Sequence, residues 1–516
     1  MARYDVIVIG AGHNGLTTAC LLARAGRRVL VLERRDITGG MCASEEFHPG
    51  YRTPGLLHDT LQVRSGVVEA LRLDQHGLDL VPPPAMLLAG PDGRGISIQA
   101  SADATAVDIA KASAHDAERW REFSAFVVRA RRVIEPLLND APPDIGAIGS
   151  LQSGSLGTLL KSAMSFQRLG KREMAELLRV PPMCVADWMN EWFEGDLLKA
   201  GMAHGAVLGM WAGPWSPGTA ANLLLEACTA GQAVKGGAGA LAFSLERAAR
   251  HHGVEIRTGT AVSSLAVSGT TATGVVLASG ETVEAGAVAA SCDPRTLFLS
   301  LVAAGTLPLR FERRVGVVRA RGTTAKVHLA LDRRLEFAAR PGERVSRART
   351  ATTLDDLERA FDAVKYGRAS ENPVLDISVP SVSNPEMAPE GRDSVSLLVH
   401  FAPHALAGGW DDGARERLGD AAVAALERVA PGVGGTVVAR EVLTPVDIAS
   451  RYGADGGHIH HTEHALDQLA IRPTMETMRY ATPLANLYLC GSGSHPGGGV
   501  TCAPGALGAA AILSRR

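Results

Sequence analysis

Three glycines and one glutamate near the start of the chain have the types and spacing to bind a dinucleotide. The segment Gly10-Ala11-Gly12-His13-Asn14-Gly15 follows a short apolar run and precedes a helical pattern, and Glu33 ends the next apolar run. In this G-x-G-x-x-G pattern, Gly10 permits a tight turn, Gly12 lets a pyrophosphate approach backbone amides, and Gly15 lets the helix pack closely on the strand. Glu33 can accept hydrogen bonds from a ribose diol. The spacing therefore predicts a dinucleotide site.

Glu33 and a second glycine-rich segment narrow the choice of dinucleotide. The charge of Glu33 would repel a 2′-phosphate, which disfavours NADP, whereas FAD and NAD share the ADP part that this pattern holds. Gly39-Gly40 extends the nucleotide loop, and residues 490–501 form a second glycine loop between a late strand and the last helix. Such a loop can bring backbone amides to a second part of a long cofactor, and a helix N-terminus favours negative charge on a reduced isoalloxazine. FAD is therefore the expected cofactor.

A βαβ unit is needed to hold these residues in place. Apolar runs and helical periodicity predict a strand buried on both faces at residues 4–10, a helix at 16–25 and a strand at 28–33. A small β meander is predicted from four β segments, at residues 254–257, 262–267, 274–277 and 282–290. A second sheet and a helix are predicted at residues 324–331, 374–379, 395–401 and 412–429. Helical patterns are predicted at residues 111–139 and 156–180, and a loop or flap is predicted between them at residues 141–157.

Composition excludes several classes of protein. The 516 residues, 46% of them hydrophobic and 21% charged, are typical of a globular chain rather than a disordered or fibrous one. Because the formal net charge is −2, no overall basic field would draw the chain to nucleic acid. The seven cysteines are odd in number, scattered and without a C-x-x-C pair, which favours a reducing compartment over a disulfide framework.

The sequence carries no sign of a targeting or membrane-spanning segment. The first apolar run begins within a few residues of the N-terminus, which leaves no room for a leader peptide. No uninterrupted apolar stretch approaches the ~20 residues that span a bilayer. We therefore expect a cytoplasmic protein, with peripheral contact to a membrane surface left open.

Ordered motifs along nearly the whole chain carry a family resemblance. Besides the two glycine loops and Glu33, they lie at residues 49–59, 211–218, 235–239, 456–463, 472–473, 482–483 and 487–505. On these motifs the sequence resembles the FAD-dependent phytoene desaturase-like oxidoreductases of the amine-oxidase superfamily. Within them it is most similar to the subgroup of pyridine nucleotide-disulphide oxidoreductase domain-containing proteins.

The resemblance implies an α/β fold in which FAD binds noncovalently between two interleaved domains. One is a Rossmann-type FAD-binding domain with a parallel sheet and a β meander, at residues 1–75, 232–300 and 480–516. The other is an α+β substrate domain, at residues 76–231 and 301–479. The residues implied to bind FAD are Gly10, Gly12, His13, Asn14, Gly15, Glu33, Arg34, Gly39, Gly40, Val262, Gly491, Gly498, Gly499, Val500 and Thr501.

The implied function is an FAD-dependent oxidoreductase. It would desaturate, dehydrogenate or isomerise an apolar small molecule, with isoprenoids or polyenes as the suggested class, by hydride transfer to flavin N5. One alternative is an amine oxidase-type enzyme that uses oxygen, and another is a flavin-binding partner protein with little turnover. The sequence determines neither the electron acceptor nor the oligomeric state.

Catalytic and substrate-pocket residues have competing interpretations. His495, His58 and Asp59 are candidates for acid–base catalysis, although His495 would also suit a role in ordering the second glycine loop. Trp211 and Trp215 would either wall an apolar substrate cavity or pack in the core. His461 matches a family position and is expected in the substrate pocket.

Two departures from the family pattern concern His458, His460 and Cys502. The two histidines stand where asparagine and phenylalanine are expected, and Cys502, which replaces a glycine, would fill space or act as a redox partner of the flavin. Together with His461, Glu463 and His464, the histidines also suggest zinc or iron. Since no second ligand cluster accompanies them and the family motif favours a turn of the substrate domain, no metal is predicted.

Overall fold

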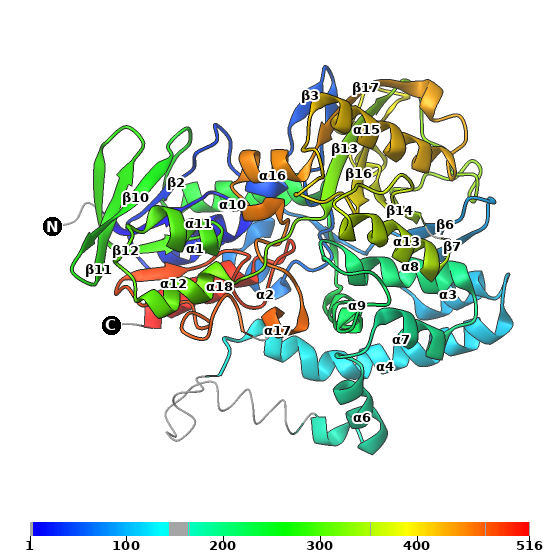
Figure 1. The fold of residues 1–516 in the computed structure, drawn as a ribbon, viewed down its shortest axis with the longest axis horizontal. Coiled ribbons are helices and arrows are strands. Elements are labelled where there is room, and N and C mark those ends of the chain that lie inside the picture. The colour runs from blue at the N-terminus through cyan, green and yellow to red at the C-terminus, as the bar shows by residue number, and fades with distance from the viewer. Residues whose placement is uncertain (1–3, 144–163, 165, 351, 470, 515–516) are drawn as a thin grey trace.

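Two seven-stranded sheets, each with helices packed on it, organise the molecule (Figure 1). The computed structural model describes residues 4–143, 164, 166–350, 352–469 and 471–514. In Figure 1 the sheet with β1 and both chain termini lies on the left, and the sheet with β13 lies on the right. The α/β class with a Rossmann-type domain is confirmed.

The first sheet is parallel at its centre. Its strand order is β10-β11-β12-β1-β2-β9, and β18 also pairs with β12. Strand β1 runs parallel to β2 and β12, whereas β10 and β11 add an antiparallel ribbon. The bounds are β1 (Tyr4–Ile9), β2 (Val29–Leu32), β9 (Glu255–Arg257), β10 (Val262–Ser268), β11 (Thr271–Leu277), β12 (Thr282–Ala290) and β18 (Leu487–Leu489).

Alternation along β1 explains why both faces of this sheet are covered. Val6 and Val8 join the core beneath α1 (His13–Arg24), α10 (Gly237–His251) and α18 (Ala503–Ser514). Ile7 and Ile9 point the other way, into the core shared with α12 (Leu309–Gly316) and the β10–β11 ribbon. A continuous apolar run is therefore required, as a parallel strand buried on both faces demands.

The second sheet has the order β17-β13-β16-β15-β14-β6-β7. Helix α15 (Asp412–Glu427) covers one face, and helices that include α8 and α9 cover the other (Figure 1). The strand bounds are β6 (Met86–Ala89), β7 (Gly95–Ile98), β13 (Thr324–Leu331), β14 (Arg347–Thr350), β15 (Leu375–Ser378), β16 (Asp393–His400) and β17 (Val437–Leu443). The helix bounds are α3 (Ala102–Ile109), α4 (Ala114–Asn139), α6 (Lys171–Arg179), α7 (Val185–Trp192), α8 (Asp196–Val207), α9 (Thr219–Thr229) and α13 (Leu354–Lys365).

Short elements complete the described chain. They are β3 (Glu46–His48), β4 (Tyr51–Arg52), β5 (Leu80–Val81), β8 (Ala233–Val234), α2 (Ser65–Leu71), α11 (Pro294–Thr296), α14 (Pro380–Ser383), α16 (Pro445–Tyr452) and α17 (Leu466–Leu469). Within the described ranges, no helix combines the length and the apolar character needed to cross a membrane.

Most predicted elements occur where the sequence places them, with one correction. The predicted strand at 254–257 is β9, which pairs in parallel with β2 and so is not part of an antiparallel meander. Local pattern shows that a strand exists but not which strand it pairs with, and this explains the error. Strands β6, β7, β14 and β17 were not predicted. Most of the predicted flap lies outside the described residues, and the domain boundaries stay predictions.

Candidate active site

The first glycine loop turns from β1 into α1 and leaves space beside Gly12. Gly10 has φ +96°, which suits glycine at the end of the strand, and Gly12 is the N-cap of α1 without any side-chain cap. A Cβ on Gly12 would meet no heavy atom within 4 Å, whereas one on Gly15 would lie 2.0 Å from the Gly10 carbonyl oxygen. The uncapped amides and the open side of Gly12 suit a phosphate group, and Gly15 suits close helix–strand packing.

A nucleotide cavity of about 210 Å³ opens beside this loop. Glu33 is buried on its wall, where Oε2 accepts from the Ala11 amide at 2.8 Å and Oε1 from the Arg35 amide at 2.9 Å. His461 also lies on the wall, and its Nδ1 is buried without a hydrogen-bond partner. Other predicted cofactor residues that line this cavity are Gly10, Gly12, His13, Asn14, Arg34, Gly40 and Val262.

The residues present fit FAD on two structural grounds. The open space beside Gly12 meets the uncapped start of α1, and the unpartnered His461 Nδ1 offers a further polar contact. Burial lowers the pKa of His461 to about 4, so this imidazole is neutral at neutral pH. A neutral ring nitrogen can donate a hydrogen bond to a phosphate oxygen without carrying charge itself.

His13 and Asn14 also connect the two glycine loops. Asn14 Nδ2 donates to Ser492 Oγ at 3.1 Å, and Asn14 Oδ1 accepts from the Gly505 amide at 3.4 Å. His13 Nδ1 lies 3.4 Å from Cys42 Sγ, beside the first loop, and His13 also interacts with the Gly499 backbone of the second loop; burial lowers the pKa of His13 to about 4. These two side chains therefore set the spacing between the loops as well as lining the nucleotide cavity.

The second glycine loop lies between β18 and α18 and borders a different cavity. Gly498, Gly499, Val500 and Thr501 line this substrate cavity, which measures about 160 Å³. The Gly498 amide donates to His464 Nε2 at 3.0 Å, and a Cβ on Gly498 would lie 2.4 Å from His460 Cβ. The predicted cofactor residue Gly491 lines neither cavity. It packs on Ser291 instead, whose carbonyl oxygen would lie 2.4 Å from a Cβ on Gly491.

Leucines and a row of charged residues also line the substrate cavity. The leucines come from several elements and loops: Leu57, Leu61, Leu138, Leu208, Leu225, Leu398 and Leu469. The charged residues Glu226, Arg349 and Asp376 line the same cavity. Arg349 Nε donates to Asp376 Oδ2 at 3.0 Å, and Arg349 Nη2 donates to Glu226 Oε1 at 2.8 Å.

His58 bridges Asp376 to a buried lysine. Its Nε2 lies 2.9 Å from Asp376 Oδ1, and its Nδ1 lies 3.0 Å from Lys326 Nζ. Although burial opposes it, the hydrogen bond from His58 and the charge of Arg349 hold the pKa of Asp376 well below its usual range. The Asp376 carboxylate therefore accepts from Nε2–H, which leaves Nδ1 to accept from Lys326. Burial lowers the pKa of Lys326 to about 7.

The three candidate catalytic residues are placed differently. His58 and Asp59 line the substrate cavity, but both ring nitrogens of His58 are engaged. Asp59 accepts from the Leu61 amide at 2.8 Å and from Arg347 at 2.6 Å. His495 does not line this cavity; its Nε2 donates to the Leu137 carbonyl oxygen at 3.2 Å. That bond suits the loop-ordering role of His495.

The predicted substrate-pocket residues lie away from the substrate cavity. Trp211 packs under Arg321, whose guanidinium carbon is 4.2 Å from the ring centroid. Trp215 is 42% exposed, and its Nε1 donates to Asp355 Oδ1 at 3.2 Å. His461 lies on the nucleotide cavity instead, because the 458–464 segment turns at His461, which has φ +65°.

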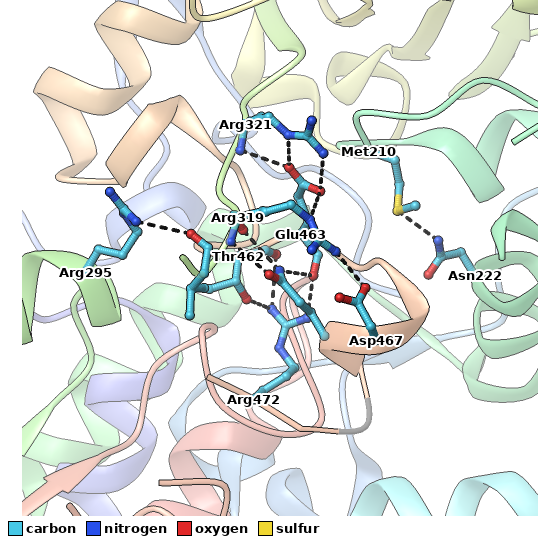
Figure 2. Close-up of polar contacts among 11 residues, drawn as sticks. Met210, Asn222, Arg295, Arg319, Arg321, Thr462, Glu463, Asp467 and Arg472 are labelled. Carbon is cyan, nitrogen blue, oxygen red and sulfur yellow. Dashed lines mark hydrogen bonds and ion pairs between the residues drawn. The ribbon is translucent and has the colours of Figure 1, made fainter. Parts of the chain in front are cut away.

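Arginines anchor the histidine-rich segment (Figure 2). The buried Glu463 carboxylate accepts from Arg321 Nε at 2.7 Å and from Arg319 Nε at 3.2 Å. Arg472 donates to the Glu463 carbonyl oxygen at 3.1 Å from the other side. This anchoring holds His460 and His464, whose rings stack at 4.2 Å, on the substrate cavity. In the part of the chain that the structure describes, no group of three or more His, Cys, Asp or Glu is placed to hold a metal ion.

Sequence reasoning missed Lys326, Arg349, Asp376 and Glu226. Lys326 and Asp376 stand between apolar strand neighbours that point to the α15 side of the sheet, and Arg349 follows Ala348, which points the same way. A polar residue inside such a run is the signal that marks the opposite face. Glu226 lies on α9 and carried no comparable signal.

Comparison with known proteins gives family matches along most of the chain. Residues 166–515 match the family described as flavin containing amine oxidoreductase, and residues 8–61 match the NAD(P)-binding Rossmann-like domain. The rat protein named pyridine nucleotide-disulfide oxidoreductase domain-containing protein 2 is 33% identical, over 98% of this chain and 92% of its own. One of the polypeptides of limonene dehydrogenase from Castellaniella defragrans is 27% identical, over 96% and 92%.

Two further comparisons extend this result. Hydroxyneurosporene desaturase of Cereibacter sphaeroides is 28% identical, over 96% of this chain and 94% of its own. Among solved structures, an oxidoreductase from Methanosarcina mazei has a similar fold, with a TM-score of 0.63 and 16% identity over 99% of this chain and 100% of its own.

Proposed function

The chain belongs to the family of flavin-containing amine oxidoreductases, and on that premise we propose that this FAD-dependent oxidoreductase desaturates or dehydrogenates an organic substrate with a largely apolar body. The observation that carries the proposal is the substrate cavity, which seven leucines line together with the second glycine loop. An apolar cavity next to the cofactor loop can hold a C–H bond in place and keep water out. The relatives named as limonene dehydrogenase and hydroxyneurosporene desaturase support this substrate class.

We assign the ADP part of FAD to the nucleotide cavity and its isoalloxazine to the side of the substrate cavity that the second glycine loop forms. The leucine side of that cavity is then left for the substrate. Bound FAD supplies the hydride acceptor. The residues proposed to hold it are Gly10, Gly12, His13, Asn14, Glu33, Arg34, Gly40, Val262, Gly498, Gly499, Val500 and Thr501.

The chain's own groups orient the substrate, exclude water from it and fix the hydrogen bonds of the cavity wall. The leucines exclude water from the reacting bond, which removes competing proton leakage. Lys326, whose pKa burial lowers to about 7, donates to His58 Nδ1, which keeps His58 Nε2–H on the Asp376 carboxylate of the cavity wall. His495 and Asp59 stay in positioning roles, because each is held by the bonds described above.

A second candidate function is oxidation of an amine with oxygen as the electron acceptor. The charged residues Glu226, Arg349 and Asp376 on the cavity wall favour it, since an ammonium group is buried at lower cost against a polar wall than against a purely apolar wall.

An anaerobic absorbance experiment separates these functions. The purified FAD-bound protein is mixed with a monoterpene alcohol, a hydroxylated C40 polyene or n-octylamine in the absence of oxygen, and flavin absorbance near 450 nm is followed. Bleaching by the monoterpene alcohol or the polyene supports the first proposal. Bleaching by the amine alone, with peroxide formed on adding air, supports the second. Bound FAD that no probe bleaches would contradict both and favour a flavin-binding partner protein.

A further inference from the structure

One row of residues across the second sheet forms the polar wall of the substrate cavity. Arg349 on β14 pairs with Asp376 on β15, Asp376 pairs with Leu398 on β16, and Leu398 pairs with Lys326 on β13. The strand neighbours Ala348, Leu375, Ile377, Ala325 and Val327 point into the core beneath α15. The row therefore forms a single stripe on one face of the sheet, where Arg349, Asp376 and Leu398 line the cavity, and His58 spans Leu398 to join Asp376 to Lys326.

This stripe continues onto α9 through Glu226. Arg349 is buried, with 7% of its surface exposed, and its guanidinium is shared by the carboxylates of Asp376 and Glu226. With one guanidinium for two carboxylates, this stripe has an excess of hydrogen-bond acceptors over donors. The other cation on the cavity wall, Arg64, is itself beside Glu135.

Glu226 holds the unused acceptor. Its Oε1 accepts from Arg349, but its Oε2 is buried and has no hydrogen-bond partner. Oε2 lies over Gly205 of α8, which also lines the cavity, and a Cβ on Gly205 would come within 1.7 Å of it. A carboxylate oxygen buried without a donor is costly, so a donor supplied by a ligand would be strongly preferred over none.

We propose that the substrate carries a hydrogen-bond donor, a hydroxyl or an ammonium group, which lies against Glu226 while its apolar body lies along the cavity leucines. The inference rests on the proposed function, because it specifies the substrate of that same site. A site built to accept a hydrogen bond discriminates strongly against analogues that lack the donor.

Replacement of Glu226 by glutamine gives a sharp prediction. Arg349 can only donate, so the amide oxygen of Gln must face it and the amide NH₂ takes the position of Oε2. Glu226→Gln therefore exchanges an acceptor for a donor at nearly constant shape. Gly205→Ala is a second variant, because its added methyl group must displace the Glu226 carboxylate without changing any charge.

The test is calorimetric titration of the FAD-bound protein with three probes of equal heavy-atom number: 1-octanol, n-octylamine and heptyl methyl ether. The wild-type protein is expected to bind the alcohol, the amine or both at least tenfold more tightly than the ether. Glu226→Gln should bring this ratio to one or below, and Gly205→Ala should reduce it at least threefold. Glu416→Gln on α15, an exposed control that pairs with Arg440, should keep it.

The amine and alcohol arms show which donor the site takes. Equal binding of all three probes, no binding of any, or an unchanged preference in Glu226→Gln would overturn the inference. Because flavin absorbance reports bound FAD in every titration, these outcomes are distinguishable from failure of the proposed redox function, which is a failure of substrate to bleach the flavin.

Discussion

At the residue scale, Gly12 and Gly15 have opposite surroundings although they belong to one motif. The space beside Gly12 is open and its φ is −69°, so a side chain fits there without backbone strain. We expect Gly12→Val to fold with little change in Tm and to lose FAD, because the side chain takes the space of the pyrophosphate. The measurements are the absorbance ratio of flavin to protein and the thermal transition. A folded Gly12→Val protein with stoichiometric FAD would contradict the assignment.

Gly15→Ala serves as the contrasting variant. Its Cβ would lie 2.0 Å from the Gly10 carbonyl oxygen and must push α1 away from β1. Overpacking of this kind costs typically ~1–3 kcal/mol. Urea unfolding should therefore show a lower midpoint for Gly15→Ala than for Gly12→Val, and the reverse order would be inconsistent with this packing.

Lys326 predicts a dependence of stability on pH. Burial lowers its pKa to about 7 from an ordinary value of 10.5, so the unfolded chain binds more protons between these two values. Stability conferred at this site therefore rises with pH from 7 towards 10.5, by up to ~1.4 kcal/mol per pH unit. Lys326→Met should remove this slope in urea unfolding measured from pH 7 to 10. An unchanged slope would show that Lys326 keeps an ordinary pKa.

At the element scale, the junction between β12 and α11 contains a carboxyl group, Asp293, whose effect on stability with pH is opposite to that of Lys326. Asp293 Oδ1 accepts from the amides of Arg295 and Thr296, while Oδ2 is buried without a partner. Burial, with a smaller effect of Asp455, raises the pKa of Asp293 to about 7. The native state therefore binds this proton more tightly than the unfolded chain, and stability falls as pH rises from about 4 to about 7.

Asp293→Asn keeps the cap of α11 and cannot ionise. We expect the variant to be more stable than the wild type at pH 8, by up to ~4 kcal/mol, and to differ little from it at pH 4. Chemical unfolding at the two pH values measures this difference. Equal destabilisation at both would mean that the carboxyl group itself, rather than its ionisation, matters to the cap.

At the scale of the whole molecule, the nucleotide cavity is lined by segments that follow strands of both sheets. Tyr452 and Gly453 follow β17 of the second sheet, yet they line the cavity together with Glu33. Arg35 packs over the Tyr452 ring at 5.0 Å, and Arg451 pairs with Glu45 at 2.7 Å. Bound FAD would therefore contact segments from both sheets and hold them together.

This arrangement predicts how FAD stabilises the protein. At a free concentration 100 times its Kd, FAD should add ~2.7 kcal/mol and raise Tm accordingly. Tyr452→Ala should weaken FAD binding without weakening FMN binding, since Tyr452 lies at the Glu33 end of the cavity where the adenosine part is assigned. Fluorescence titrations with both flavins give the two Kd values. An equal loss for FAD and FMN would place Tyr452 elsewhere on the cofactor.

The sequence by itself determined the features that depend on neighbours along the chain. The turn around Gly10, the helix after it, Glu33, the strands of the first sheet and β13, β15 and β16 of the second follow from backbone conformation and from period-2 or period-3.6 apolar patterns. The second glycine loop predicted FAD, the family resemblance implied the same cofactor, and the family match confirms it.

Only the tertiary structure decided which distant residues meet. Strand pairing and register place Arg349, Asp376 and Lys326 in one row, and His58 reaches that row from a separate segment. The same kind of pairing put β9 beside β2, and the turn at His461 placed this side chain on the nucleotide cavity. Local patterns determine that a strand forms and which face is apolar, but register depends on contacts between segments tens to hundreds of residues apart, which no local pattern encodes.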